Sequence, residues 1–331
     1  MPKKEPDEPK QITLHTCALT TPQALKLRVL LTERGWKFET RPYTLYFAQK
    51  DRLTVAVYEK GPKCVVQGRG TEDFVRFILE PEIIGEAKLG YEELHNPAMF
   101  EPHFGIDESG KGDFFGPLVI AGAYTDRDST HLLRDAGIMD SKRITSDTRI
   151  RELAKVIRET EGVLVSSITL APEKYNALYK KFRSLNRLLG WGHAKVIENL
   201  LDLRPDCKRA LSDQFADPSL IERMFKEKGR IVLESRTKAE SDVAVAAASI
   251  IARERFINWL RDTERELGAP LVKGASSAVK DAAREIIKRH GVGVLERVAK
   301  VHFKTAHEVA PDHYAFVEKP KFVPRKKTDG A

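Results

Sequence analysis

Cysteine is scarce in this sequence, and long apolar runs are missing. The three cysteines, Cys17, Cys64 and Cys207, are odd in number and form no CxxC pair, so neither a disulfide framework nor a zinc knuckle is indicated. No stretch reaches the roughly 18 consecutive apolar residues that a membrane-spanning helix needs. The opening "MPKKEPDEPK" lacks the apolar core of a signal peptide. These absences predict a protein of the reducing cytoplasm with no membrane partner.

The bulk composition is that of a globular protein with a basic surplus. Hydrophobic residues make up 41% and charged residues 31% of the 331 positions, which is enough chain for about two domains. Lys and Arg total 56 against 48 Asp and Glu, so the net charge is +8. A basic balance permits binding to a polyanion but does not establish it.

The N-terminal part predicts a small α+β domain over residues 11–80, after a disordered start over residues 1–10. A Thr-Pro start and apolar residues at Leu25, Val29 and Leu30 indicate a helix that ends at Gly35. The runs "YTLYFAQ", "RLTVAVYEKG" and "KCVVQGRG" then predict an antiparallel meander.

A second helix and a linker follow the meander. "TEDFVRFILEPE" returns to helical spacing through Phe74, Phe77 and Ile78. Residues 81–100 lack a sustained period and carry proline at both ends, so they are expected to be a linker.

The remainder, residues 101–313, predicts an α/β domain with a mixed sheet flanked by helices. Strands are expected at "FGIDESG", "PLVIAGAYT", "VLVSSITLA", "KRALSD" and "RIVLES". Helices are expected at "SDTRIRELAKVIRET", at "NRLLGWGHAKVIENLLD" and over residues 239–266. The final residues, 314–331, predict a solvated basic tail.

The stretch "GIDESGKGDF" has two possible interpretations. It fits the GxxxxGK pattern of a phosphate-binding loop, but Gly112 stands where such a loop needs a magnesium-binding Ser or Thr. Asp107 and Glu108 would also repel a triphosphate. We therefore favour an acidic metal site beside a Gly-Lys-Gly turn.

Two further acids support the metal interpretation. Asp213 ends another predicted strand, and Glu240 begins a helix of nearly all small residues. Strand ends of one sheet can bring such acids together, and clustered carboxylates repel unless cations neutralise them. Oxygen ligands favour Mg²⁺ or Mn²⁺, which assist phosphodiester hydrolysis.

In order and approximate spacing, "GIDESGKGDFFGPLV", "DSKRI", "LSDQF", "TKAES" and "AAASIIAR" resemble the motifs of the type 2 ribonucleases H, most closely the bacterial ribonuclease HIII branch. The resemblance covers about residues 100 to 310. The N-terminal unit is similar to the TATA-box-binding-protein-like domain of that branch. The resemblance implies a ribonuclease H-like catalytic domain preceded by a substrate-binding domain.

The resemblance also implies roles for individual residues. Asp107, Glu108, Asp213 and Glu240 match the four metal-coordinating carboxylates, and Gly110, Lys111 and Gly112 match a turn that contacts ribose 2′-hydroxyls. Further expected substrate contacts are Lys142, Lys238, Lys273 and Ser276, with Gln67 on the N-terminal sheet. Asn186 and His193 are expected to be structural, and Asp217 and Asp242 to be solvated acids.

The resulting hypothesis is a monomeric endoribonuclease that cuts the RNA strand of RNA/DNA hybrids. Two divalent ions, roughly 4 Å apart, would direct in-line attack by water and leave 5′-phosphate and 3′-hydroxyl ends. One alternative is cleavage at single ribonucleotides embedded in DNA, as ribonuclease HII performs. Another is a hybrid-binding protein without catalysis.

Overall fold

The computed structural model describes residues 12–85, 93, 96–138, 144–213, 219–225, 231–236 and 239–315. The chain divides into two compact units, Met1–Phe100 and Glu101–Ala331. No helix in the described part of the chain is long and apolar enough to cross a membrane. The predicted disordered start, residues 1–10, and nearly all of the predicted basic tail lie outside the described residues.

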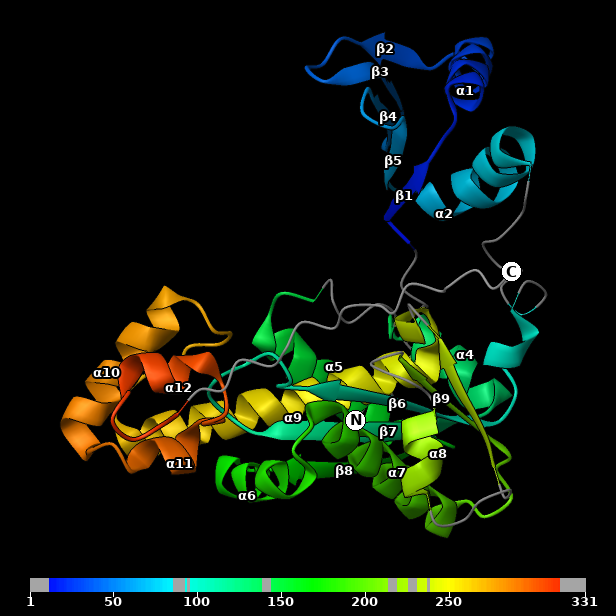
Figure 1. Ribbon diagram of the computed structural model, residues 1–331. Helices are drawn as coiled ribbons and strands as arrows, with labels where there is room; N and C mark the ends of the chain where they lie inside the picture. Colours follow the sequence, from blue (N-terminus) through cyan, green and yellow to red (C-terminus); the bar gives the residue numbers. More distant parts are fainter. Residues whose placement is uncertain are drawn as a thin grey trace, which may run out of the picture. The chain divides into compact units, whose positions relative to one another are not determined.

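The first unit is built on a five-stranded antiparallel sheet of order β1-β5-β4-β3-β2 (Figure 1). Its strands are β1 (Leu14–Ala18), β2 (Lys37–Glu39), β3 (Thr44–Lys50), β4 (Leu53–Tyr58) and β5 (Lys63–Gly68). The sequence predicted the last three. It did not predict β1 and β2, which are short edge strands with exposed residues along them.

Two helical segments cover one face of this sheet. Helix α1 (Thr21–Glu33) begins with a capping box between Thr20 and Gln23. Helix α2 (Thr71–Phe74) continues as the π-helix η1 (Val75–Ile84), four residues into the range expected to be linker.

The buried face of α1 is not the face that carries Leu25 and Val29. Ala24, Leu27 and Leu31 are buried, whereas Leu25 and Val29 are 59% and 58% exposed. The sequence correctly predicted a helix here but not which face is buried, because both sets have helical spacing and only packing against the sheet distinguishes them. In the second helical segment, Phe74 packs in the core but Phe77 is exposed.

The second unit has a mixed sheet of order β10-β9-β6-β7-β8. Strand β6 pairs antiparallel with β7 and parallel with β9, and β9 pairs parallel with β10. The strands are β6 (His103–Ser109), β7 (Leu118–Thr125), β8 (Leu164–Leu170), β9 (Arg209–Asp213) and β10 (Val232–Arg236). All five predicted strands are present.

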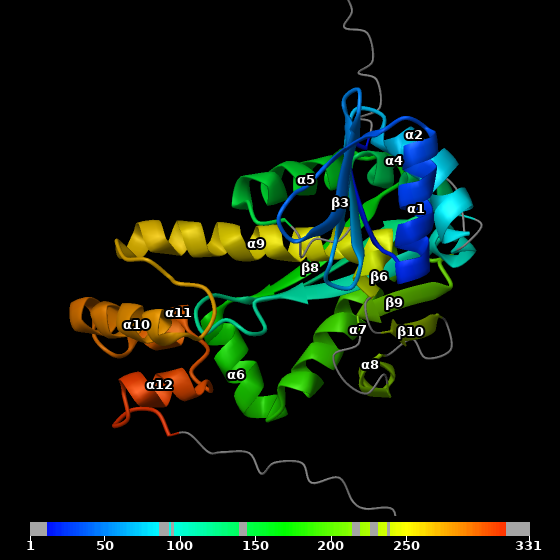
Figure 2. The same cartoon turned by 90° about the horizontal axis from the view of Figure 1, so that it is seen from above.

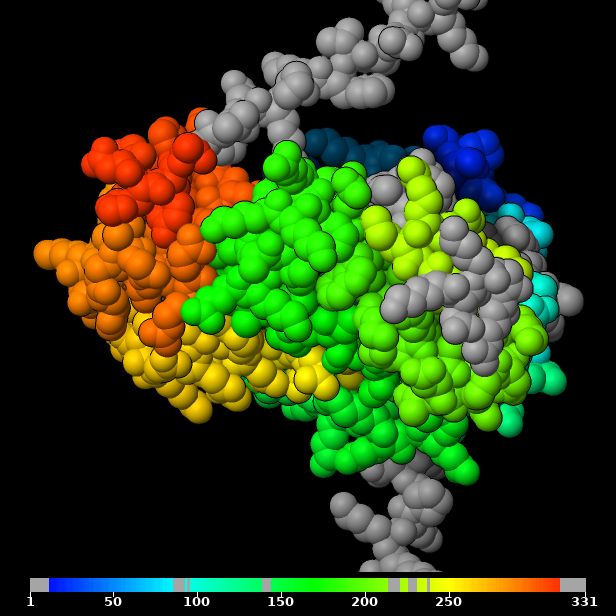
Figure 3. Space-filling view, turned by 60° about the horizontal axis from the view of Figure 1, so that its bottom comes forward, coloured from blue at the N-terminus to red at the C-terminus, as the bar shows by residue number. Residues whose placement is uncertain are grey.

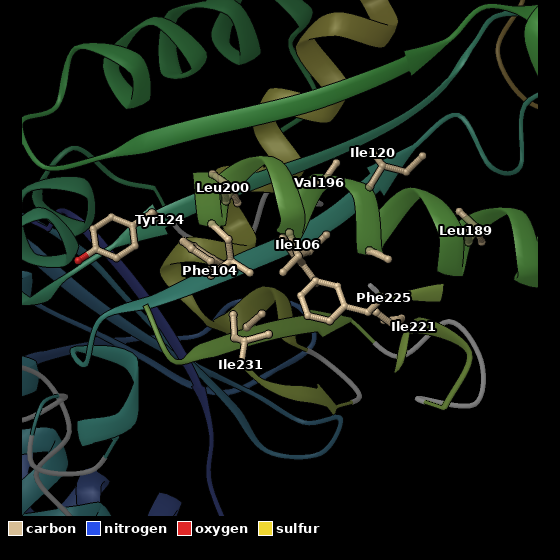
Figure 4. Packing of buried hydrophobic residues seen from close by; sticks show 14 of the residues in the cluster. Phe104, Ile106, Ile120, Tyr124, Leu189, Val196, Leu200, Ile221, Phe225 and Ile231 are labelled. Atoms are coloured by element: carbon tan, nitrogen blue, oxygen red, sulfur yellow. The ribbon is translucent and has the colours of Figure 1, made fainter. Parts of the chain in front are cut away.

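Helices lie on both faces of this sheet, as predicted (Figures 1 and 2). The helical elements of this unit are α4 (Arg127–Asp135), α5 (Asp147–Glu159), α6 (Pro172–Phe182), α7 (Leu185–Leu203), α8 (Ser219–Met224), η4 (Ala239–Ser241), α9 (Val243–Leu267), α10 (Ser277–His290), α11 (Val294–Val298) and α12 (Lys304–Val309). The short η2 (Pro97–Met99) lies at the end of the first unit. Helix α7 packs on one face, where Ile106 and Ile120 meet Val196 and Leu200 (Figure 4). Helix α9 packs on the other face. The group α10 to α12, orange to red, lies next to the yellow end of α9 (Figure 3).

A close approach between β6 and α9 depends on small residues. A Cβ atom on Gly105 would lie 2.1 Å from the backbone of Ala244 and Val245, far inside van der Waals contact. Ala246, Ala247 and Ala248 are fully buried along the same helix. The small residues therefore bring α9 directly against the strand that carries Asp107 and Glu108.

Candidate active site

Asp107 and Glu108 lie near the end of β6 and face opposite sides of the sheet, because side chains alternate along a strand. Asp107 faces α9, where it accepts hydrogen bonds from the Ser249 side chain and, at 2.8 Å, from the Glu108 backbone N–H. Burial, together with the charge of Glu108, raises the pKa of Asp107 to about 7. A divalent cation nearby would favour the ionised form of this carboxyl.

Glu108 faces α7, where both of its oxygens are held. His193 Nε2 lies 3.1 Å from Oε2, and Lys111 Nζ lies 3.4 Å from Oε1. Burial opposes ionisation of Glu108, but His193 and then Lys111 outweigh it and lower its pKa. His193 itself is fully buried. The expectation that His193 is merely structural therefore misses its direct contact with a candidate ligand.

Asp213 ends β9, which runs parallel to β6 with Ser212 opposite Ile106. This register brings Asp213 to the same end of the sheet as Asp107, as the sequence predicted. Its Oδ1 accepts a 3.3 Å hydrogen bond from the backbone N–H of Ala239, which ties β9 to η4. The three carboxylates line one pocket of about 340 Å³ together with Ser109, Gly110, Lys111, Gly112, Asp113, Ser249 and Arg253.

Glu240 lies on the η4 turn, one residue after Ala239, and is not among the residues that line this pocket. Among the residues that the structure describes, no three His, Cys, Asp or Glu side chains converge into a ready-made ligand set. Strand alternation partly explains why these side chains do not converge, since it directs the Asp107 and Glu108 side chains to opposite faces of the sheet. The donor chemistry nevertheless fits Mg²⁺ or Mn²⁺, because every candidate ligand atom is a carboxylate oxygen.

Asp242 is not a solvated acid, contrary to the sequence-based expectation. It is fully buried and caps α9, accepting hydrogen bonds from the backbone N–H groups of Ala244 and Val245 at 3.0 and 3.3 Å. The same Oδ1 lies 3.0 Å from His103 Nε2. Burial opposes its ionisation, but His103 and these further partners lower its pKa. Glu240 and Asp242 thus belong to a turn and a cap rather than to one regular helix.

The Gly-Lys-Gly turn joins these acids to the opposite wall of the pocket. Gly110 has φ +87°, and a Cβ there would lie 2.2 Å from the Pro117 carbonyl oxygen, so glycine is required for the fold. Gly112 has open space around it. Downstream, Asp113 Oδ1 accepts a 2.6 Å hydrogen bond from the Gly274 N–H.

Lys300 holds the segment that follows this turn, and the sequence analysis did not identify it. Its fully buried ammonium donates hydrogen bonds to the carbonyl oxygens of Asp113 and Gly116 at 2.9 and 2.7 Å. Burial lowers the pKa of Lys300 to about 7, although Asp113 acts in the opposite direction. A lysine between apolar residues in "RVAKVHF" was the available signal.

The other predicted substrate contacts have varied surroundings. Lys273 pairs with Asp147 at 2.9 Å, and Ser276 is the N-cap residue of α10. Asn186 is exposed in the first turn of α7. Lys142, Lys238 and Asp217 lie outside the described residues. Arg253, which the sequence analysis did not single out, lines the acidic pocket.

The first unit carries a second concave surface on the sheet face opposite its helices. This surface, of about 590 Å³, includes Gln67, as predicted, with Thr54, Tyr58 and Arg52. The Arg41 guanidinium lies 3.4 Å from the centre of the Phe47 ring. This surface therefore offers cationic, aromatic and amide groups together.

Comparison with known proteins gives concordant matches. A family model described as Ribonuclease HII matches residues 104–306. A ribonuclease HIII of Protochlamydia amoebophila is 42% identical over 283 residues, which cover 85% of this chain and 92% of the relative. One of Chlamydia muridarum is 43% identical over 286 residues, covering 86% and 92%.

Solved structures agree with these matches. The crystal structure of Bst-RNase HIII in complex with Mn²⁺ superposes with a TM-score of 0.63 at 26% identity, covering 91% of this chain and 99% of that one. Aquifex aeolicus RNase H3 gives a TM-score of 0.51 at 28% identity, covering 87% and 99%.

Proposed function

The chain belongs to the ribonuclease HII and HIII family of metal-dependent endoribonucleases, and we propose that it hydrolyses the RNA strand of RNA/DNA hybrids. The observation that carries this proposal is the pocket that Asp107, Glu108 and Asp213 line together with the Gly110–Gly112 turn. Acids suited to divalent ions thus lie beside a turn suited to a ribose backbone.

We assign metal binding to Asp107, Glu108, Asp213 and Glu240, with two ions of Mg²⁺ or Mn²⁺. When bound, such ions would neutralise charge at the scissile phosphate and lower the pKa of the attacking water, and cleavage of the bond between phosphorus and the 3′-oxygen would leave 5′-phosphate and 3′-hydroxyl ends. The chain's own contribution is orientation. Ser249 holds Asp107, His193 and Lys111 hold Glu108, and the Ala239 N–H holds Asp213.

The Gly110–Gly112 turn is the element that we propose recognises the ribose of the RNA strand. Gly112 has no neighbouring atom within 4 Å of a would-be Cβ, so a sugar can approach its backbone closely. The 2′-hydroxyl distinguishes RNA from DNA at such a contact. Phosphate contacts are assigned to Lys142, Lys238, Lys273 and Ser276; Lys273 can leave Asp147, because exposed ion pairs contribute little.

The first unit is the proposed substrate-binding, TATA-box-binding-protein-like domain, through the surface that contains Gln67. Phosphate contacts release counterions, so their loss weakens binding and flattens its salt dependence. A protein beginning near Asn96 should keep metal-dependent hydrolysis with a raised KM and a shallower salt slope. Equal hybrid affinity of the truncated, folded protein and the full chain at every salt concentration would refute this role.

A substrate comparison tests the function as a whole. The full chain, given Mg²⁺ or Mn²⁺, should cut a labelled RNA/DNA hybrid at internal sites, leave 3′-hydroxyl ends that a polymerase extends, and stop when EDTA is added. Preferential cutting of a DNA duplex with one embedded ribonucleotide would favour the ribonuclease HII-like alternative. Metal-independent binding without cleavage would establish a hybrid-binding protein.

We further propose that the enzyme acts as a monomer in the cytoplasm.

A further inference from the structure

Two cysteines of the first unit face each other across neighbouring strands. Strands β1 and β5 lie side by side (Figure 1), and Cys17 on β1 is directly opposite Cys64 on β5 in their antiparallel register. The Gly68 N–H donates to Thr13 O, and the Leu19 N–H donates to Pro62 O, so by alternation Cys17 and Cys64 form a hydrogen-bonded pair. Such pairs have Cα atoms about 5.5 Å apart, and disulfides span Cα separations of roughly 4.4–6.8 Å. The backbone therefore already has the spacing that a disulfide requires.

The two thiols are chemically different. Cys17 is partly exposed and Cys64 is fully buried. A hydrogen bond from the Cys64 thiol is the largest cause of a lowered pKa at Cys17; burial and Glu80 oppose this effect, and His15 on the same strand adds to it. The same contact and burial raise the pKa of Cys64. The accessible sulfur is thus the one that is readily present as the thiolate, the nucleophilic form, and the buried one keeps its proton.

We propose that Cys17 and Cys64 form a peroxide-reactive dithiol that closes to a disulfide between β1 and β5. The Cys17 thiolate attacks one oxygen of a hydroperoxide, the O–O bond breaks, and hydroxide or alkoxide leaves to give a sulfenic acid. The Cys64 sulfur then attacks the Cys17 sulfur, and water leaves. Two electrons pass from the two thiols to the peroxide, which is reduced to water, or to water and an alcohol.

This site lies outside the acidic pocket and the proposed hydrolysis. In the described sheet, β1 is an edge strand next to β5, so the disulfide fixes it to the sheet at a residue of the buried core. The closed loop contains α1 and β2 to β4, which restricts the unfolded chain. Oxidation should therefore raise the melting temperature of the first unit, and a reducing thiol should reverse the effect.

The test uses the full chain, reduced and then treated with hydrogen peroxide. Intact mass should fall by two hydrogens, titratable thiols should fall from three to one, and a digest should join the Cys17 and Cys64 peptides. Cys207, which is buried and whose pKa burial raises, supplies the control. Cys207→Ser should oxidise as the wild type does.

Two more variants separate the roles of the cysteines. Cys64→Ser should stop at a Cys17 sulfenic acid that dimedone traps, whereas Cys17→Ser should form neither that adduct nor the cross-link. The proposal is overturned if the wild-type protein keeps three thiols under peroxide. It is also overturned if the peptide that becomes linked contains Cys207.

Discussion

His193 Nε2 lies 3.1 Å from Glu108 Oε2, although the two residues are separated by 85 positions in the chain. The contact joins α7 to the strand that carries both adjacent acids. With Lys111 on the other oxygen, it fixes the direction of the Glu108 carboxylate. We therefore regard His193 as a positioning residue for the metal site.

His193→Ala should lower kcat by about 10- to 100-fold, the usual effect of removing a group that orients a metal ligand. KM for the hybrid should change little, because the His193 side chain is fully buried and so has no exposed surface for the hybrid to contact. His193→Gln is the matched control, since its amide can still donate to Glu108. Steady-state kinetics and Mn²⁺ titration of both variants provide the check; equal, near-normal kcat values would contradict the assignment.

Gly110 and Gly112 provide a second matched pair. Gly110→Ala should destabilise the protein, because the new Cβ meets Pro117 O and the left-handed φ is unfavourable for alanine. Gly112→Ala should melt as the wild type does but lose hybrid cleavage, because the methyl group would block the proposed approach of the ribose. Melting curves and cleavage rates on both variants decide; full activity in Gly112→Ala would remove this residue from the substrate site.

Asp242→Ala should cost roughly 2–4 kcal/mol of stability, since it leaves the buried His103 ring without its hydrogen-bond partner and also removes a helix cap. The folded-state pKa of Asp242 is lowered, so its contribution is present above the ordinary Asp pKa and disappears as the pH falls through the lowered value. Urea unfolding at neutral and acid pH measures this effect.

Glu240→Ala should instead lose hybrid cleavage with a small change in stability. The reverse pattern, with activity lost in Asp242→Ala and stability lost in Glu240→Ala, would exchange the two roles.

Because of Lys300, the free energy of unfolding should increase as the pH rises above neutral. Its pKa is lowered to about 7, so between that pH and its ordinary value the unfolded chain binds more protons than the folded one. Stability relative to Lys300→Met should then rise with pH above about 7, by up to about 1.4 kcal/mol per pH unit. Urea unfolding of both proteins at several pH values is the measurement. A difference independent of pH would show that Lys300 does not lose its proton in this range.

The sequence was sufficient to predict those parts of the candidate site that a local sequence pattern indicates. Asp107 and Asp213 lie at or near the ends of apolar strands, and the alanine-rich start of α9 indicated close packing beside them. The parts it could not supply depend on tertiary contacts. His193 gains its role from a strand far away in the chain, and Lys300 from carbonyls of a distant turn.

What the sequence left open or predicted wrongly has the same origin. Leu25 and Val29 correctly indicated a helix, but they did not show that the sheet packs against the other side of α1. Asp242 looked like a surface acid because nothing near it in sequence reveals His103, its buried partner. In each case the competing interpretations have equal local propensity, and long-range packing selects one.

The central claim is that the carboxylates of the acidic pocket hold the ions that cut RNA, and Asp213→Asn tests it most directly. Asparagine keeps the shape and can still accept the Ala239 hydrogen bond, but it loses the charge that binds a cation. Cleavage of a labelled RNA/DNA hybrid and hybrid affinity should be measured on the same preparation. We expect cleavage to be abolished while affinity stays close to that of the wild type; near-normal turnover in this variant would contradict the account.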